Sequence, residues 1–332
     1  MSAPARVAVA GAGAWGRNHL RVLHGLGALA GAVEVCEASR DQVRRDYPGL
    51  PVWGSLGEAF RHGGPVDGVV IATPAPTHAG LAAQVLREGR GVLVEKPMTL
   101  EAREAQGLVD QAEAAGRVLM VGHLLLYQPA VRELKRLLDS GLLGQVYRIH
   151  QERANLGRVR STESALWSLA PHDVAVLIHL MGEAPLRVAA SGAAFLQPGL
   201  HDDVHLELAF SGGRSAHVHV SWYWPGRRRA LRVLGERGML VYDEADQSLT
   251  LHRKRLLGGD TLRRLDAVDD GTVRVFEGPG EPLRLEDEHF LHCLASGSRP
   301  MSDGRSGLDV IRVLERADAQ LLGALPPTLK EV

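Results

Sequence analysis

The stretch Arg6–Gly16, which reads Arg-Val-Ala-Val-Ala-Gly-Ala-Gly-Ala-Trp-Gly, decides the fold of this chain. Its apolar run over Arg6–Ala10 predicts a buried strand, because the run is short, apolar and ended by glycine. A helical pattern follows near Arg17–Leu29. A strand, a Gly-x-Gly-x-x-Gly turn and a helix in this order are typical of the phosphate-binding unit of a dinucleotide site.

Each glycine of the turn has a physical role in that unit. Gly11 allows the tight turn, Gly13 lets the backbone approach a pyrophosphate, and Gly16 permits close packing of helix on strand. The start of the helix adds unpaired N–H groups and a partial positive charge, which attract phosphate. The predicted cofactor contacts in this turn are Gly11, Gly13, Ala14, Trp15 and Gly16.

The rest of the first third alternates apolar runs with helical patterns. Strands are predicted over Gly31–Cys36, Gly68–Ala72, Gly91–Glu95 and Val118–Gly122, with a helix over Thr77–Glu88. Such alternation predicts an α/β Rossmann domain, in which a parallel, doubly wound sheet is covered on both faces.

After residue 123 the pattern changes to long strands with few helices. The predicted strands are Val146–Arg153, Leu186–Ala194, His205–Phe210, Ser215–Trp222 and Ala230–Val233, and helices are predicted over Pro129–Ser140, Pro171–Met181 and Asp309–Leu322. This pattern predicts an α+β domain with a large, mostly antiparallel open sheet. We therefore expect a cofactor-binding domain over residues 1–123 and a substrate-binding and oligomerisation domain over residues 124–332.

Composition excludes several classes of partner. The 332 residues carry a formal net charge of −1, so no overall field favours nucleic acid or a membrane surface. The chain has no apolar run of the ~20 residues that a membrane-spanning helix needs. Cys36 and Cys293 lie far apart, and Cys36 falls in an apolar strand pattern that predicts a buried thiol. A cytoplasmic protein is expected.

An acidic residue about 20 positions beyond the glycine turn selects between the two nicotinamide dinucleotides. Glu37 follows the second predicted strand, where a carboxylate accepts hydrogen bonds from the adenosine ribose and repels a 2′-phosphate. NAD is therefore the expected cofactor. Arg40 is the opposing signal, because an arginine there can accommodate a phosphate.

Two further loops follow predicted strands at the edge where ligands of parallel sheets bind. Thr73, Pro74 and His78 belong to the first, although helix initiation explains this loop as well as cofactor contact does. Glu95 and Lys96 belong to the second. Lysine is rarely buried without a partner or a function, so Lys96 is a candidate for the reaction centre.

These motifs resemble the glucose–fructose oxidoreductase, inositol dehydrogenase and MocA (Gfo/Idh/MocA) family. The resemblance rests on Gly11–Gly16, Ala72-Thr73-Pro74 with His78, and Glu95-Lys96-Pro97. It continues through Val121–Ala130, Asn155-Leu156-Gly157, Trp167–Asp173, Glu281-Pro282-Leu283 and Glu288-His289-Phe290, which look like the UDP-N-acetylglucosamine 3-dehydrogenase branch.

The resemblance implies an NAD-dependent oxidation of a sugar or nucleotide-sugar hydroxyl, with Lys96 and His172 as the active-site pair. It implies a sheet that carries substrate on one face and forms homodimer or homotetramer contacts through the other. A cyclitol or free-sugar dehydrogenase and a non-catalytic NAD(H)-binding protein remain as alternatives. The second alternative is motivated by Ser168, because family members usually have Asp four residues before this histidine.

The residues around His172 also predict a role for it, independently of the resemblance. With Pro171 at the first position of a helix, His172 lies in the first turn, where the helix dipole disfavours imidazolium. A neutral imidazole is what a general base needs near pH 7.

The remaining candidates concern the substrate. Its predicted contacts are Lys96, Tyr127, Asn155, Arg158, Arg160, Ser168, His172 and Arg229. The arginines suit a pyrophosphate, and Tyr127, Trp167, Trp222 and Trp224 are candidates to stack on a sugar or uracil, with core packing as the equal alternative. His205, His217 and His219 are interpreted as a polar sheet face, so no metal site is predicted.

Overall fold

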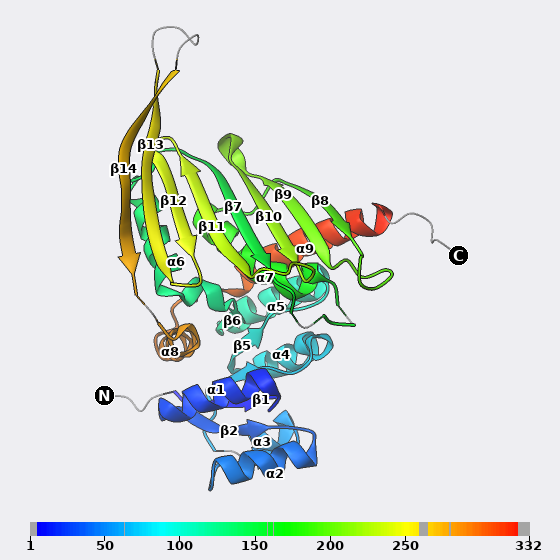
Figure 1. Cartoon of the computed structure of the whole chain (residues 1–332). Helices are drawn as coiled ribbons and strands as arrows, with labels where there is room; N and C mark the ends of the chain where they lie inside the picture. Colours follow the sequence, from blue (N-terminus) through cyan, green and yellow to red (C-terminus); the bar gives the residue numbers. More distant parts are fainter. Residues whose placement is uncertain are drawn as a thin grey trace, which may run out of the picture. The chain divides into compact units, whose positions relative to one another are not determined.

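The computed structural model describes residues 5–62, 64–157, 159–161, 163–258, 265–278 and 280–324. The chain forms two compact units (Figure 1). The first comprises Met1–Tyr127 and Glu281–Ile311, and the second comprises Gln128–Gly280 and Arg312–Val332. The return of residues 281–311 to the first unit was not anticipated by the sequence analysis, which expected a single boundary near residue 123.

A six-stranded parallel sheet forms the centre of the first unit, in the order β3-β2-β1-β4-β5-β6. The strands are β1 (Val7–Ala10), β2 (Leu29–Val33), β3 (Val52–Trp53), β4 (Gly68–Ile71), β5 (Gly91–Glu95) and β6 (Leu119–Gly122). Every residue of β1, β2, β4, β5 and β6 is buried, as expected for parallel strands covered on both faces. The predicted Rossmann fold is confirmed.

Helices connect these strands and cover the sheet. They are α1 (Ala14–Gly25), α2 (Glu37–Asp46), α3 (Leu56–His62), the 3₁₀ turn η1 (Ala75–Thr77), α4 (His78–Arg87), α5 (Ala102–Ala115), the 3₁₀ turn η2 (Leu124–Tyr127) and the returning α8 (Pro282–Ser296). Helix α8 packs against α1 and η2 and buries Phe290 completely. Its apolar side chains thus become part of the first core.

The second unit contains an eight-stranded sheet in the order β14-β13-β12-β11-β7-β10-β9-β8. The strands are β7 (Val146–Ala154), β8 (Arg187–Ala193), β9 (Asp203–Ala209), β10 (Ser215–Ser221), β11 (Arg228–Gly235), β12 (Gly238–Asp243), β13 (Ser248–Gly258) and β14 (Leu265–Glu277). Neighbouring strands are antiparallel except β7 and β10, which are parallel. The predicted mostly antiparallel sheet is confirmed.

Helices cover one face of this sheet. Helix α6 (Pro129–Asp139) packs against β12–β14, and α7 (Ala165–Met181) packs against β7, β9 and β10 (Figure 1). Strand β10 alternates accordingly: Ala216, Val218 and Val220 are completely buried, whereas His217 and His219 point to the opposite face. Helix α9 (Gly304–Ala324) begins in the first unit and ends in the second.

The structure corrects two predictions of local structure. Strand β2 ends at Val33, and Cys36 caps α2 with an exposed thiol instead of lying buried in the strand. Helix α7 begins at Ala165 behind its N-cap Ser164, so Pro171 lies inside the helix. The residues Ala165–Ala170 are mostly good helix formers, and they extend the helix toward its N-terminus before the proline.

None of the helices among the described residues is long and apolar enough to cross a membrane.

Candidate functional site

The loop between β1 and α1 has the shape of a phosphate cradle. Gly11 has φ +92°, and a Cβ there would lie 2.7 Å from the carbonyl oxygen of Ala72. A Cβ on Gly16 would lie 1.8 Å from the carbonyl oxygen of Gly11, so only glycine fits. A Cβ on Gly13 would meet no atom within 4 Å, and Ala14 and Trp15 beside it are exposed. The first helical turn is therefore open to a ligand.

The carboxylate at the end of β2 is Glu34, not Glu37. Glu34 directly follows the strand, and its side chain accepts hydrogen bonds from the backbone N–H of Ala12 at 2.7 Å and of Cys36 at 2.9 Å. It therefore contacts the glycine loop. The signal that identifies it in the sequence is the acid immediately after the apolar run, which the predicted strand boundary at Cys36 obscured.

Glu37 lies instead in the first turn of α2 and points to solvent. Its carboxylate pairs with Arg40 and, at 3.2 Å, with Arg44, and its side chain is 64% exposed. Hydrogen bonds from Arg40 and then Arg44 lower the pKa of Glu37. Arg40 also donates to the backbone carbonyl of Glu34 at 2.8 Å, which holds the guanidinium against the chain just after β2.

His78 braces the loops that follow β4 and β5. Its Nε2 lies 2.8 Å from the carbonyl oxygen of Thr73, its Nδ1 lies 2.8 Å from that of Pro97, and the residue is buried. Thr73 contacts Thr77 through their hydroxyl oxygens at 2.7 Å. These contacts favour the structural interpretation of His78 over direct cofactor contact.

Lys96 follows β5, next to a buried charge cluster. The Lys96 backbone N–H donates to Oε2 of Glu95 at 3.1 Å, and Trp15 donates its indole N–H to the same carboxylate. His19 lies between Glu95 and Asp287, 3.1 Å and 2.9 Å away. The sequence analysis missed His19 and Asp287, because α8 returns to this unit from far along the chain.

Burial and charge set the protonation states of this cluster. Burial alone would lower the pKa of His19, but Asp287 and Glu95 outweigh it and hold that pKa well above its usual range. Burial raises the pKa of Glu286, which is fully buried on α8, well above its usual value. His123, just after β6, has its pKa lowered to about 4, chiefly by burial. The His19 imidazole is thus favoured in its charged form, whereas burial favours the neutral form of Glu286.

In the second unit, α7 carries Ser168 and His172 one helical turn apart. His172 lies in the interior of the helix, so the argument that the dipole keeps it neutral does not apply. Asp173 is fully buried and accepts hydrogen bonds from Gln151 at 2.6 Å and from Arg153 at 2.9 Å. Its carboxylate is engaged by the sheet and therefore does not replace the missing Asp at position 168.

Several predicted substrate residues are already paired with a glutamate or buried in the core. Arg229 pairs with Glu244 at 2.7 Å, and Arg160 pairs with Glu163 at 2.8 Å, while Arg158 lies outside the described residues. Tyr127, in the first unit, is buried with its hydroxyl 3.0 Å from that of Ser302, which supports the core-packing alternative. Trp222 is likewise buried.

Asn155 lies near a rim of exposed apolar side chains on the segments that follow β7, β8 and β10. Asn155 directly follows β7, and its backbone N–H donates to the carbonyl oxygen of Ser221 at 3.1 Å. Because β7 and β10 run parallel, the segments after both strands lie side by side. The large exposed apolar side chains of these segments and of the loop after β8 are Leu156, Phe195, Leu196, Tyr223 and Trp224.

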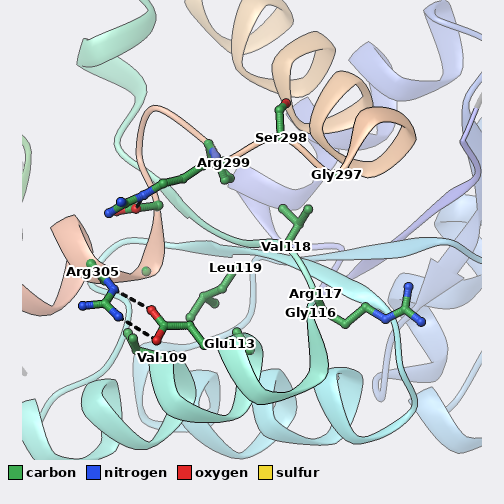
Figure 2. A pocket seen from close by; sticks show the side chains of 14 residues that line it. Val109, Glu113, Gly116, Arg117, Val118, Leu119, Gly297, Ser298, Arg299 and Arg305 are labelled. Carbon is green, nitrogen blue, oxygen red and sulfur yellow. Dashed lines mark hydrogen bonds and ion pairs between the residues drawn. The ribbon is translucent and has the colours of Figure 1, made fainter.

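A separate hollow of about 500 Å³ lies in the first unit at the amino end of β6 (Figure 2). Arg305 and Glu113 face each other across it with contacts of 2.5 and 2.7 Å. Ligands of parallel sheets bind beyond the carboxyl ends of the strands, which is the opposite edge. This hollow therefore contains none of the predicted cofactor residues.

Comparison with known proteins decides the family. Residues 5–123 match the family described as "Oxidoreductase family, NAD-binding Rossmann fold", and residues 131–241 match the "GFO/IDH/MocA C-terminal domain". The chain belongs to the GFO/IDH/MocA oxidoreductase family. It is thus an NAD-binding oxidoreductase, and the predicted cofactor is confirmed.

The similar proteins are named after different substrates. The chain is 26% identical over 312 residues to UDP-N-acetylglucosamine 3-dehydrogenase from Acidithiobacillus ferrooxidans, covering 92% of this chain and 94% of that protein. It is 23% identical to scyllo-inositol 2-dehydrogenase (NAD(+)) from Bacillus subtilis, covering 89% and 88%. The WlbA dehydrogenase from Bordetella pertussis, solved with NADH and UDP-GlcNAcA, has a similar fold, with a TM-score of 0.79, 20% identity and coverage of 98% and 97%.

Proposed function

We propose that this GFO/IDH/MocA protein oxidises a secondary hydroxyl of a UDP-sugar, at the 3-position, with NAD as hydride acceptor. The proposal is carried by one observation about the parallel sheet. Gly13, Glu34 and Lys96 follow β1, β2 and β5, so a phosphate cradle, a carboxylate and an ammonium share the carboxyl edge of one sheet. That edge is where parallel sheets bind dinucleotides.

The cradle fits NAD in its charge and in its open space. The N–H groups that open α1 suit the pyrophosphate, and Gly13 leaves the room that the phosphates need. Glu34 would accept hydrogen bonds from the ribose hydroxyls, a role that the sequence analysis gave to Glu37. The bound nicotinamide supplies a carbon that accepts hydride.

Lys96 and His172 divide the remaining chemistry. The Lys96 ammonium stabilises negative charge on the reacting oxygen as the carbonyl forms. The His172 imidazole accepts the hydroxyl proton as general base. The two residues belong to different units, so their joint action is tested by kinetics.

The UDP-sugar class is supported by the first relative above and by the exposed rim after β7 and β10. Tyr223 is 52% exposed and Trp224 is 37% exposed, and aromatic rings of this kind stack on nucleobases and sugars. Asn155 beside them offers both a donor and an acceptor to sugar hydroxyls.

An uncharged cyclitol or free sugar is the second candidate, and a specific observation favours it. Arg229 and Arg160, the described arginines expected to meet a pyrophosphate, are each already paired with a glutamate. A pyrophosphate would have to displace Glu244 or Glu163. UDP binding separates the candidates: a UDP-sugar enzyme is stabilised by millimolar UDP in a thermal melt and competitively inhibited by it.

Single-turnover kinetics test the roles of Lys96 and His172. We compare Lys96→Ala, His172→Ala and the double variant with Lys135→Ala, which removes a partly exposed lysine paired with Asp139. NADH formation should fall by orders of magnitude in each single variant, while NAD affinity persists. If both groups serve one hydroxyl, the double variant is hardly slower than the slower single variant. Independent, multiplicative losses, or near-normal turnover in Lys96→Ala, would overturn the assignment.

A further inference from the structure

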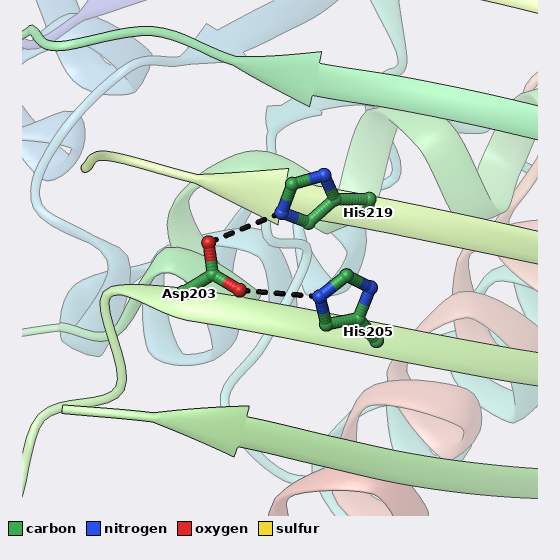
Figure 3. A group of neighbouring side chains, drawn as sticks. All are labelled: Asp203, His205 and His219. Carbon is green, nitrogen blue, oxygen red and sulfur yellow. Dashed lines mark hydrogen bonds and ion pairs between the residues drawn. The ribbon is translucent and has the colours of Figure 1, made fainter. Parts of the chain in front are cut away.

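We propose that the sheet of the second unit carries a site for a zinc-class divalent metal ion, formed by Asp203, His205 and His219. The site lies on the face of the sheet opposite the one that α7 covers, and it does not depend on the proposed function. Its three side chains come from neighbouring strands β9 and β10 (Figure 3).

The register of the two strands brings the ligands together. His205 and His219 are direct antiparallel partners, and their rings stack with centroids 4.2 Å apart and planes 5° apart. Nε2 of His219 lies 3.1 Å from Oδ2 of Asp203, and Nε2 of His205 lies 3.3 Å from Oδ1. One donor atom from each residue can be chosen so that all three lie within 4.8 Å of one another.

These separations are close to those of a zinc site. With bonds of about 2.0–2.2 Å in a tetrahedron, donor atoms lie about 3.4 Å apart. The distances of 3.1 Å and 3.3 Å are near that value, each to a different oxygen of Asp203. With one carboxylate oxygen as ligand, the three donor atoms lie within 4.8 Å of one another, and small side-chain rotations would close the set around an ion. Two imidazoles and one carboxylate leave a fourth position for water or another ligand.

The charge around the three residues favours a cation. Arg232, the nearby cation in this hollow, is paired with Glu152 at 2.8 Å. The carboxylate of Asp203 is therefore opposed by imidazoles alone among its described contacts, and a divalent ion would supply the missing positive charge.

Further groups around the hollow fit a metal site. His217 lies 5.6 Å from His205 and 5.7 Å from His150 between ring centroids, so four imidazoles line one hollow. Trp224 contacts the His219 ring edge-on at 5.5 Å and restricts its motion. A polar sheet face, which the sequence analysis favoured, is the competing interpretation of these same Nε2–carboxylate contacts, and metal titration separates the two.

Calorimetric titration of the untagged full chain with ZnCl₂ tests the site. We expect one Zn²⁺ per chain with a dissociation constant of about 10 μM or tighter. His205→Ala and His219→Ala should each weaken binding at least about tenfold, whereas the control His252→Ala, on β13, should not. Co²⁺ should give the intense visible absorption of four-coordinate cobalt in the wild type and in His252→Ala, but not in His205→Ala or His219→Ala.

Two results would overturn the proposal. One is no saturable binding at about 100 μM free Zn²⁺, and the other is His205→Ala and His219→Ala binding as tightly as His252→Ala. If the circular dichroism spectrum shows that a histidine variant is unfolded, Asp203→Asn replaces it in the test, because asparagine has nearly the same size as aspartate. It too should lose zinc affinity, and wild-type affinity in a folded Asp203→Asn protein would equally overturn the site.

Discussion

Nδ1 of His19 lies 2.9 Å from Oδ1 of Asp287, although the two residues are 268 positions apart in the sequence. Both side chains are completely buried. The contact joins α1, the helix behind the glycine loop, to α8, which returns from the end of the second unit. Because Glu95 contacts the other ring nitrogen, the same imidazolium links α1 to the end of β5, next to Lys96.

Replacing His19 by alanine should strongly destabilise the first unit. Asp287 and Glu95 would lose their shared cation in a buried place, and removal of one partner of a buried ion pair costs about 3–5 kcal/mol. Urea unfolding measures the loss. His24→Ala, an exposed histidine on the same helix, is the control and should change stability by less than about 0.5 kcal/mol. A His19→Ala protein as stable as the control would show that the cluster carries no net charge interaction.

Glu286 should make stability fall as pH rises above the pKa of an unfolded glutamate. Burial raises its pKa in the folded protein, whereas the unfolded chain ionises with a pKa of about 4.3. The contribution of Glu286 is therefore complete below that value and is lost as pH rises through the folded pKa. Glu286→Gln cannot ionise, so it should gain stability over the wild type as pH rises from 5 to 8.

The free energy of unfolding is measured across that pH range for the wild type and Glu286→Gln. Glu288→Gln, whose side chain is exposed on the same helix, is the control. A wild-type-minus-variant difference that stays flat with pH would mean that Glu286 is ionised in the folded protein.

Glu34, and not Glu37, should control the choice of dinucleotide. Glu34→Ala should weaken NAD binding about 10- to 100-fold and narrow the preference over NADP, because it removes both the ribose acceptor and the negative charge. Glu37→Ala removes an exposed side chain from α2 and should leave NAD affinity within about threefold of the wild type. Tryptophan fluorescence titrations with both nucleotides decide it. Equal losses in the two variants would return the role to Glu37.

The sequence predicted the first unit well because strand–helix alternation and glycine spacing are local signals. Its errors concern the ends of a strand and of a helix, and each error changed the interpretation of a candidate site residue. Ending the second strand at Cys36 instead of Val33 directed the prediction to Glu37, whereas the carboxylate that directly follows the strand is that of Glu34. Starting a helix at Pro171 instead of Ala165 placed His172 in a first turn that does not exist.

Other contacts join residues that are far apart in the sequence, so local sequence patterns cannot predict them. No periodicity connects His19 to Asp287, since α8 packs on α1 only through the tertiary fold. The cross-strand register that opposes His205 and His219 depends on the hairpin between β9 and β10. Arg229 was recognised as a charge, but its partner Glu244 lies on the loop after the neighbouring strand and was invisible in the sequence.

Ser168 should limit the reaction rate through the basicity of His172. An Asp one turn before the imidazole would favour its protonated form and stabilise the imidazolium that appears as the substrate proton is taken. The nearby Asp173 does not supply this charge, because its carboxylate is bound by Arg153 and Gln151. Ser168→Asp should therefore move the acidic limb of the pH–rate profile to higher pH and raise the maximal rate.

Ser168→Asn is the matched control for this variant, because it has nearly the size of Asp without its charge. Position 168 is only 6% exposed, so both variants add the same bulk to a buried site and their difference isolates the charge. Turnover of one substrate is measured from pH 5 to 10 for the three proteins. An acidic limb that coincides in the Asp and Asn variants would mean that residue 168 does not communicate with His172. A shifted limb with a lower maximal rate would make Ser168 a substrate contact, and the substrate of this protein would then differ from that of its Asp-bearing relatives.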